Sequence, residues 1–341
     1  MDDPLLSVEN LHTQFDTRDG TVRAVDGVSF DVDRGETVCL VGESGSGKTV
    51  TCESVTRLIP TPPGEVTDGR IVFDGDDLTE YSEKRLRNVR GNRIAHVFQN
   101  PQNALDPVYT VGAQIVETMQ FHRDVGDAAA RRRAIDLLER VGIPKASTRV
   151  DDYPHEFSGG MRQRAVIAMA LASDPDLLIA DEPTTALDVT IEAQILDLLA
   201  DLQAERDMAV LFVTHDLGVV AEIADRVVIM YAGKVMERGD VHDVFDQPSH
   251  PYTQALLDCL PGQGTELRPI EGSLADPVDP PDGCRFHPRC PHATEACRRE
   301  GQPPLHAVAN GQRASCVYYG SDRDASTVLD GPAASQEVND D

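Results

Sequence analysis

The stretch Gly42-Glu43-Ser44-Gly45-Ser46-Gly47-Lys48-Thr49 decides the fold of this chain, because its spacing is that of the phosphate-binding loop G-x-x-x-x-G-K-[ST]. An apolar run over residues 37–41 precedes it and predicts a buried strand. Residues 50–59 follow and predict a helix that ends before Pro60. Strand, glycine loop and helix are the context that the motif requires, which argues against the alternative of a chance glycine turn.

The residue types in this loop suit the binding of a nucleoside triphosphate. Gly42, Gly45 and Gly47 allow the backbone to turn its N–H groups toward phosphate oxygens, and the helix near Val50 adds the positive end of its dipole. Lys48 is expected to reach the β- and γ-phosphates, and the Thr49 hydroxyl is expected to ligate Mg²⁺. The predicted nucleotide-binding segment is therefore residues 42–50.

Length and charge narrow the classes of function. The 341 residues suffice for one large α/β domain and a smaller one. No apolar run approaches the ~20 residues of a membrane helix, and the acidic N-terminus lacks a signal, so we expect a cytosolic or cytosol-facing peripheral protein. The net charge of −27 with only four lysines argues against nucleic acid as the main partner. It favours a salt-loving source over an ordinary acidic cytosolic protein.

Polar side chains follow three further predicted strands, at the point where each strand ends. Gln99 ends residues 94–99, Asp181 and Glu182 end residues 177–182, and His215 follows residues 208–213. Carboxyl ends of parallel strands gather at one edge of a sheet, where ligands bind. Asp181 is expected to hold Mg²⁺ and Glu182 to polarise a water against the γ-phosphate.

Two other segments are candidate nucleotide contacts. Ser158, Gly159 and Gly160 open a predicted helix, and its exposed N–H groups form a second phosphate-binding device. Phe15 lies in the strand region before the loop, where it could stack on an adenine ring or pack within a hairpin. The sequence alone leaves these two alternatives for Phe15 open.

Together, and in this order, the motifs resemble those of the nucleotide-binding subunits of ABC transporters. The matching segments are Walker A (42–49), the Q-loop glutamine (Gln99), the signature FSGGMRQ (157–163), Walker B (177–182), the D-loop (186–188) and the switch histidine (His215). The signature departs from the usual LSGGQ at Met161 but keeps its serine and glycines.

The resemblance implies an α/β fold, a P-loop NTPase ABC cassette. Such a cassette has a RecA-like core, an antiparallel β subdomain and a helical signature subdomain. The expected domains are a nucleotide-binding domain (1–260, with its helical subdomain at about 103–165), a cysteine-bearing C-terminal extension (261–320) and a disordered acidic tail (321–341).

The resemblance also implies a mechanism. Two such subunits face each other, and each ATP lies between one Walker A and the other subunit's Ser158, Gly159 and Gly160. It gives Glu182 the role of catalytic base, His215 that of γ-phosphate contact and Asp188 that of a bridge between subunits. Gln99 is expected to sense the metal and the attacking water.

Longer motifs are similar to those of dipeptide and oligopeptide importer ATPases. They are FQNPQNALDPV, YPHEFSGGMRQR, DEPTTALDVT and PSHPYT (248–253). This branch implies two membrane-spanning permease subunits, a second paralogous ATP-binding subunit and an extracellular solute-binding protein. Nickel or oligosaccharide uptake, a soluble non-transport ABC ATPase, and a module that senses iron or redox state are the alternatives.

Seven cysteines divide into two groups. Cys39, Cys52 and Cys259 have apolar or helical neighbours and are expected to pack in the core. Cys284, Cys290, Cys297 and Cys316 follow a Pro- and Gly-rich linker, and their wide gaps favour an iron–sulfur cluster over zinc or no metal. Nearby arginines (Arg285, Arg289, Arg298 and Arg299) are expected to stabilise the thiolates. The resemblance points to a [4Fe–4S] cluster in the same extension.

Overall fold

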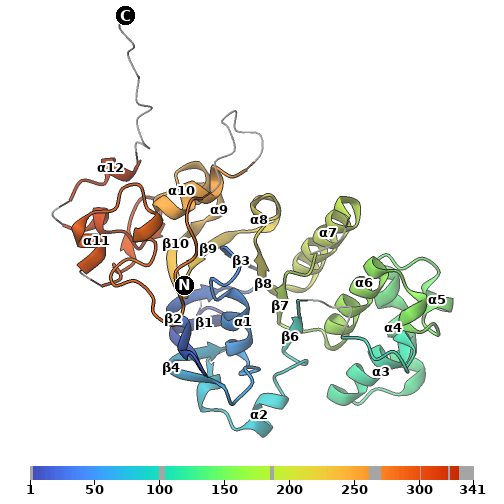
Figure 1. The fold of residues 1–341 in the computed structure, drawn as a ribbon. Helices are drawn as coiled ribbons and strands as arrows, with labels where there is room; N and C mark the ends of the chain where they lie inside the picture. Colours follow the sequence, from blue (N-terminus) through green and yellow to red (C-terminus); the bar gives the residue numbers. More distant parts are fainter. Residues whose placement is uncertain are drawn as a thin grey trace, which may run out of the picture.

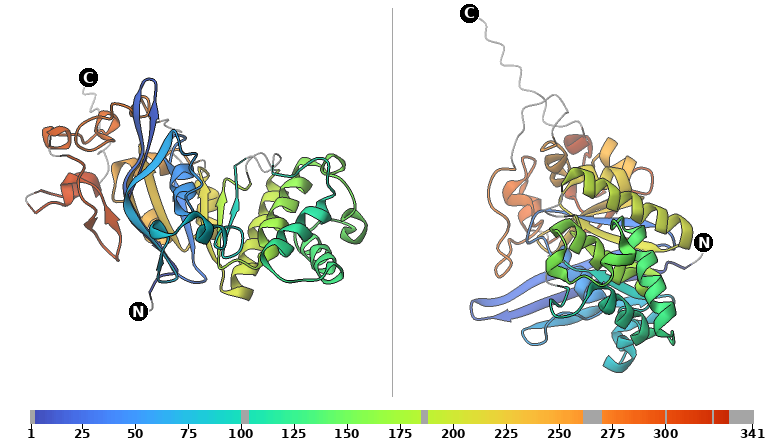
Figure 2. Two further views of the ribbon diagram at one scale, coloured as in Figure 1. Left: turned by 90° about the horizontal axis from the view of Figure 1, so that it is seen from below. Right: turned by 90° about the vertical axis from the view of Figure 1, so that its right-hand side faces the viewer.

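The computed structural model describes residues 3–99, 104–184, 188–260, 270–299, 301–321 and 323–329. Two sheets form the middle of the molecule, a group of helices lies on one side, and the C-terminal extension lies on the other (Figures 1 and 2). The expected P-loop NTPase fold, with an antiparallel β subdomain and a helical subdomain, is confirmed.

The central sheet runs through the core of the molecule, with the strand order β11-β12-β10-β9-β3-β8-β7-β6. Its strands are β3 (Thr37–Val41), β6 (Ile94–Val97), β7 (Leu177–Asp181), β8 (Ala209–Thr214), β9 (Arg226–Tyr231), β10 (Lys234–Asp240), β11 (His306–Ala307) and β12 (Arg313–Ala314). The five from β9 to β6 are parallel, and β3, β7 and β8 are buried at every position. Such strands read as continuous apolar runs because both faces of the sheet are covered.

A second, antiparallel sheet covers one face of the central sheet. Its order is β2-β1-β4-β5, with β1 (Leu6–Thr17), β2 (Gly20–Val32), β4 (Gly64–Phe73) and β5 (Asp76–Asp77). Apolar side chains from both sheets, such as Val8, Phe30 and Leu211, share one buried cluster, together with Val55 of α1 (Lys48–Val55). This packing places β1 and β2 beside the phosphate-binding loop.

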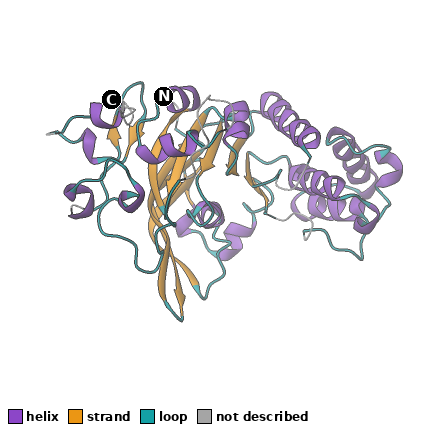
Figure 3. Cartoon of the chain, turned by 45° about the horizontal axis from the view of Figure 1, so that its top comes forward, coloured by secondary structure: helices purple, strands orange, loops and turns teal. Residues whose placement is uncertain are grey.

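The helical subdomain packs beside the edge of the central sheet that ends in β6 (Figures 1 and 3). It contains α3 (Val111–His122), α4 (Asp127–Arg140), α5 (Ala146–Arg149) and α6 (Gly159–Ala170). Ile115, Leu138 and Ala165 from three of these helices are buried in one cluster. These helices extend from Val111 to Ala170, and α6 carries the signature segment.

The remaining helices lie along the sheets and their edges. They are α2 (Glu83–Arg87), α7 (Val189–Arg206), α8 (Leu217–Ile223), α9 (Val241–Asp246), α10 (Pro251–Leu257), α11 (Glu295–Arg299) and α12 (Ser326–Leu329). Helix α1 ends at Val55 rather than Ile59, because Arg57 has a positive φ of 51° that breaks the helix. Among the residues that the structure describes, no helix is long and apolar enough to cross a lipid bilayer.

The C-terminal extension continues the central sheet. Strand β12 pairs with β10 through Ala314 and Glu237, and β11 pairs with β12. The sequence predicts a disordered tail from residue 321, whereas α12 is ordered and buries Val328. Its backbone carbonyl accepts a hydrogen bond of 2.6 Å from Gln254 of α10. Residues 330–341 lie outside the described residues.

Candidate functional site

A cavity of about 360 Å³ lies at the carboxyl edge of the central sheet and brings together half of the predicted nucleotide contacts. Its lining residues come from β1, β2, the phosphate loop, the strand ends and the extension: Phe15, Val22, Ala24, Ser44, Gly45, Gly47, Lys48, Thr49, Val50, Gln99, Glu182 and Pro277. Phe15 lies on β1 and lines this cavity, and its ring also lies beside Gly64 of β4.

The phosphate loop has the backbone shape that its glycines predict. Gly47 has φ 101°, and a Cβ atom there would lie 2.3 Å from the Ala24 carbonyl oxygen, so only glycine fits. The Lys48 ammonium donates to the carbonyl oxygens of Gly42 and Glu43 at 2.7 and 3.0 Å. Burial lowers the pKa of Lys48, while the carboxylates of Glu182 and Asp181 oppose that shift. The loop is therefore closed around the ammonium group that would meet the phosphates.

Glu182 stands between the two other strand-end residues. Its carboxylate accepts a hydrogen bond of 3.1 Å from the Gln99 amide and lies 3.2 Å from Nδ1 of His215. The Glu182 backbone has a positive φ of 46°, an uncommon conformation for a residue other than glycine and one that concentrates at functional sites. The structure thus brings Gln99, Glu182 and His215 together, although they lie far apart in the sequence.

Asp181 and Thr49 fit a magnesium ion. Burial raises the pKa of Asp181, and the Thr49 hydroxyl opposes that shift. The buried Asp181 Oδ1 has no hydrogen-bond partner. An unpaired, buried carboxylate oxygen beside a hydroxyl is what a hard cation would satisfy.

The signature and D-loop residues are not part of this cavity lining. Ser158 caps α6, and its hydroxyl accepts a hydrogen bond of 3.3 Å from the Met161 N–H. Asp188 caps α7 in the same way, accepting from the Ile191 N–H at 3.0 Å. The start of α6 is built as the sequence predicts. Ala186 and Leu187 of the D-loop lie outside the described residues.

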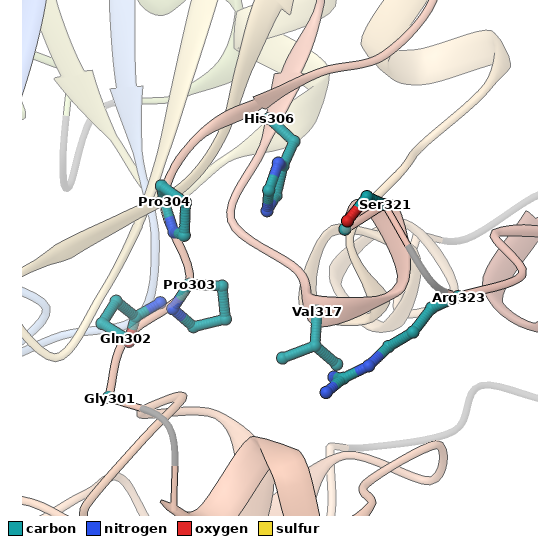
Figure 4. A pocket seen from close by; sticks show the side chains of 9 residues that line it. Gly301, Gln302, Pro303, Pro304, His306, Val317, Ser321 and Arg323 are labelled. Carbon is teal, nitrogen blue, oxygen red and sulfur yellow. The ribbon is translucent and has the colours of Figure 1, made fainter.

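A second cavity, of about 380 Å³, lies within the extension. Figure 4 shows Pro303 and Pro304 on one side of it and Val317, Ser321 and Arg323 on the other. His306 also lines it. No residue of the predicted nucleotide site belongs to its lining, so size alone does not identify the functional cavity in the described part of this chain.

The four clustered cysteines lie in one neighbourhood, and their thiols interact electrostatically. Burial raises the pKa of Cys284 and Cys290 to about 12 and that of Cys316 to about 11, and their neighbouring thiols add to each shift. Within the described ranges, no group of three or more His, Cys, Asp or Glu side chains is placed to hold a metal ion. As placed, the side chains therefore do not form a single-ion site.

The expected role of the arginines is wrong for two of them. Arg285 forms an ion pair with Asp26, and Arg289 forms one with Glu43 at 2.8 Å. Both guanidinium groups thus point to the cassette rather than stabilising thiolates. Arg299 pairs with Glu295 on its own helix. The expectation for Cys259 is also wrong, since it is exposed at the end of α10, whereas Cys39 and Cys52 are buried as predicted.

Sequence reasoning missed the contribution of the extension to the nucleotide cavity. Pro277 lines it, and the Arg23 N–H donates to the Pro277 carbonyl at 3.1 Å, which fixes this segment against β2. Tyr252 accepts a hydrogen bond of 3.0 Å from the Glu43 N–H of the phosphate loop. The only sequence signal for these contacts is the PSHPYT motif that contains Tyr252, which gives no indication of its partner.

Comparisons with known proteins show which family the chain resembles. The family model described as "ABC transporter" matches residues 25–185, and "Oligopeptide/dipeptide transporter, C-terminal region" matches residues 236–297. The dipeptide transport ATP-binding protein DppD of Bacillus subtilis (strain 168) is 53% identical over 86% of this chain and 89% of its own length. The oligopeptide transport ATP-binding protein OppD of the same organism is 51% identical over 90% of this chain and 86% of its own.

Solved structures show the same architecture. One is the ATP-binding cassette MJ0796, a dimer in a post-hydrolysis state bound to ADP and Pi. It has a TM-score of 0.63 and 26% identity, covering 69% of this chain and 98% of that one. Another is cbiO1 from Clostridium perfringens, with a TM-score of 0.61 and 30% identity over 72% of this chain and 92% of that one.

Proposed function

This chain belongs to the ATP-binding subunits of ABC transporters, in the dipeptide and oligopeptide branch, and from that premise we propose that it hydrolyses ATP to energise import of short peptides. The observation that carries the proposal is the position of Glu182. Its carboxylate contacts both Gln99 and His215 at the rim of a cavity that also contains the phosphate loop. A water held by this group would face the terminal phosphate of a nucleotide in the loop.

Each residue of the site then has a role of its own. Lys48 and the loop N–H groups bind the phosphates, and Phe15 contacts the base. Thr49, Asp181 and Gln99 would hold Mg²⁺, which would neutralise charge on the phosphate oxygens. Glu182 accepts a proton from the attacking water, and His215 contacts the γ-phosphate.

We also propose that the signature serves a second subunit. Ser158, Gly159 and Gly160 begin a helix outside this chain's own nucleotide cavity, so their N–H groups are available to another phosphate. ATP between one phosphate loop and the other subunit's signature closes the pair, with Asp188 at their contact, and hydrolysis releases it. A paralogous subunit is the proposed partner.

Two permease subunits are the proposed membrane partners of the cassette, which places it on the cytoplasmic side of the membrane. Val108 and Tyr109 are 70% and 56% exposed and follow the Gln99 loop along the chain. Two adjacent exposed apolar side chains offer a small apolar surface to a partner chain. We propose that a permease segment contacts Val108 and Tyr109 and moves when the Gln99 loop responds to ATP.

Co-purification of the tagged chain from native membranes in high salt tests this proposal. We expect two multi-span permease chains and a second ATP-binding chain, with a peptide-binding protein encoded beside them. Recovery with ribosomal or DNA-repair proteins would instead support a soluble ABC ATPase. If the binding protein encoded beside them binds nickel or a sugar, the ATPase role would stand, but peptide import would be contradicted.

For the extension (261–320, after a cassette of residues 1–260), we propose that Cys284, Cys290, Cys297 and Cys316 hold a [4Fe–4S] cluster. The support is that four thiols gather in one neighbourhood, and a cluster takes four cysteines. Against it, the described side chains form no group placed for a metal ion. Anaerobic purification should give a brown protein with four iron atoms per cluster. A colourless protein with stoichiometric zinc, or with no metal, would contradict the proposal.

We further propose that the acidic chain is adapted to high salt. Its net charge of −27 produces self-repulsion that dissolved ions screen. The free energy of unfolding should therefore rise with potassium chloride concentration well into the molar range. A chain whose stability is the same in dilute and in concentrated salt would contradict this adaptation.

A further inference from the structure

The C-terminal extension is joined to the phosphate loop by a buried arginine. Arg289 has a side chain only 4% exposed, and its Nη1 lies 2.8 and 3.0 Å from the two carboxylate oxygens of Glu43, the second residue of the loop motif. The same guanidinium donates to the backbone carbonyls of Glu271 and Ile270 at 2.9 and 3.1 Å. One side chain of the extension therefore ties the loop to the linker segment that passes beside it.

A second contact holds the same loop residue through its backbone. The Glu43 N–H donates to the Tyr252 hydroxyl at 3.0 Å. Tyr252 is fully buried, and its ring packs against those of Tyr231 and Phe286, with centroids 4.8 and 5.1 Å away. Phe286 belongs to the extension, so both the side chain and the backbone of Glu43 depend on groups packed with the extension.

A neighbouring arginine of the extension reaches the loop indirectly, through the turn between β9 and β10. Arg285 forms an ion pair with Asp26 and donates to the Ala232 carbonyl at 2.7 Å. Ala232 and Gly233 form the turn between β9 and β10, and the Gly233 N–H donates to the Ser46 carbonyl at 2.9 Å. The turn that supports the middle of the phosphate loop is thus itself held by the extension.

The linker adds a wall to the nucleotide cavity. Pro277 lines it, and a Cβ atom on Gly45 would lie 3.1 Å from the Leu274 side chain. We propose that the extension is a functional part of the nucleotide site, with Arg289 as a positioning residue that sets the phosphate loop through Glu43. This inference rests on the proposed ATPase function and adds a determinant of nucleotide affinity outside the cassette motifs.

Binding of a fluorescent ATP analogue to the purified full-length chain tests the proposal. Arg289→Gln and Glu43→Gln each remove the same ion pair from opposite sides, and each should weaken binding by roughly three- to tenfold. The double variant should bind no worse than the weaker single variant, because the two changes break one interaction. Arg289→Lys, which keeps the charge but not the fork of donors, should recover part of the affinity.

Arg299→Gln is the matched control, since that arginine is exposed and pairs only with Glu295 in the described structure, and it should bind as the wild type does. Glu43→Gln keeps the test valid if Arg289→Gln fails to fold. Unchanged affinity in Glu43→Gln, or losses that add fully in the double variant, would overturn the inference. Failure of the wild-type chain to bind the analogue would overturn the proposed function and this inference with it.

Discussion

The phosphate loop and the C-terminal extension show two different ways in which a sequence builds one site. In the loop, neighbours in the sequence are neighbours in space: the Lys48 ammonium meets carbonyls five and six residues before it. In the extension, Arg289 and Arg285 meet partners 246 and 259 residues away. A short motif therefore predicts the chemistry of the loop correctly. The position of the two arginines near the cysteines in the sequence, in contrast, predicts the wrong contacts for their side chains.

The largest expected effect tests the loop itself. Lys48→Ala removes the buried ammonium that would meet the phosphates, and we expect ATP binding to weaken by roughly a hundredfold. Binding of a fluorescent ATP analogue measures this. Lys84→Ala, on the exposed face of α2, is the control and should bind normally. Equal binding by both variants would contradict the assignment of the loop.

The second prediction distinguishes the role of the phosphate loop from the role of the signature segment. Ser158→Asp and Ser158→Asn both keep an acceptor that can cap α6, but only aspartate places a negative charge where a second subunit's ATP would lie. In the assembled transporter, Ser158→Asp should lower ATP hydrolysis by roughly a hundredfold and far more than Ser158→Asn. ATP binding by the isolated chain should not change. Weaker binding by the isolated Ser158→Asp chain would show instead that the signature serves its own cavity.

A smaller effect is expected at the strand ends. His215→Ala removes the ring that lies 3.2 Å from Glu182, and kcat should fall roughly 10- to 100-fold with KM nearly unchanged. His215→Gln keeps a hydrogen-bonding side chain and should fall less. Steady-state ATP hydrolysis by the transporter gives both constants. A rise in KM alone would indicate a role in ground-state binding.

The smallest effect on activity is expected for a variant at the contact between the cassette and the extension. Glu237 of β10 is buried and accepts hydrogen bonds from the Ser249 and His250 N–H groups and from Gln312 of the extension. Burial raises its pKa from 4.5 to about 7. Between these values the folded chain holds a proton that the unfolded chain releases, so the free energy of unfolding falls as pH rises.

Glu237 should contribute about 3 kcal/mol to the change between pH 4.5 and 7, and Glu237→Gln, which cannot titrate, should lack this contribution. Urea unfolding of both proteins across this range measures the difference. ATP hydrolysis per folded molecule should be similar in the two. The same pH slope in both proteins would show that Glu237 does not carry the shift.

The same contrast explains what could be predicted from the sequence. The buried strands of the central sheet are continuous apolar runs, and the strand-end residues Gln99, Glu182 and His215 follow them directly, so sheet topology brings them together. Strands β11 and β12 have two residues each, too few for any alternation to be visible. Their pairing with β10, and the Arg289–Glu43 ion pair that accompanies it, arise only from tertiary packing.

The most direct test of the account is peptide uptake by vesicles that contain the transporter purified with this chain. With wild-type chain, we expect a labelled dipeptide to accumulate when ATP and Mg²⁺ are supplied on the side of the ATP-binding subunits. With Glu182→Gln, ATP should still bind and accumulation should stop, while Glu222→Gln on the exposed face of α8 should transport normally. Undiminished accumulation with Glu182→Gln would contradict the account.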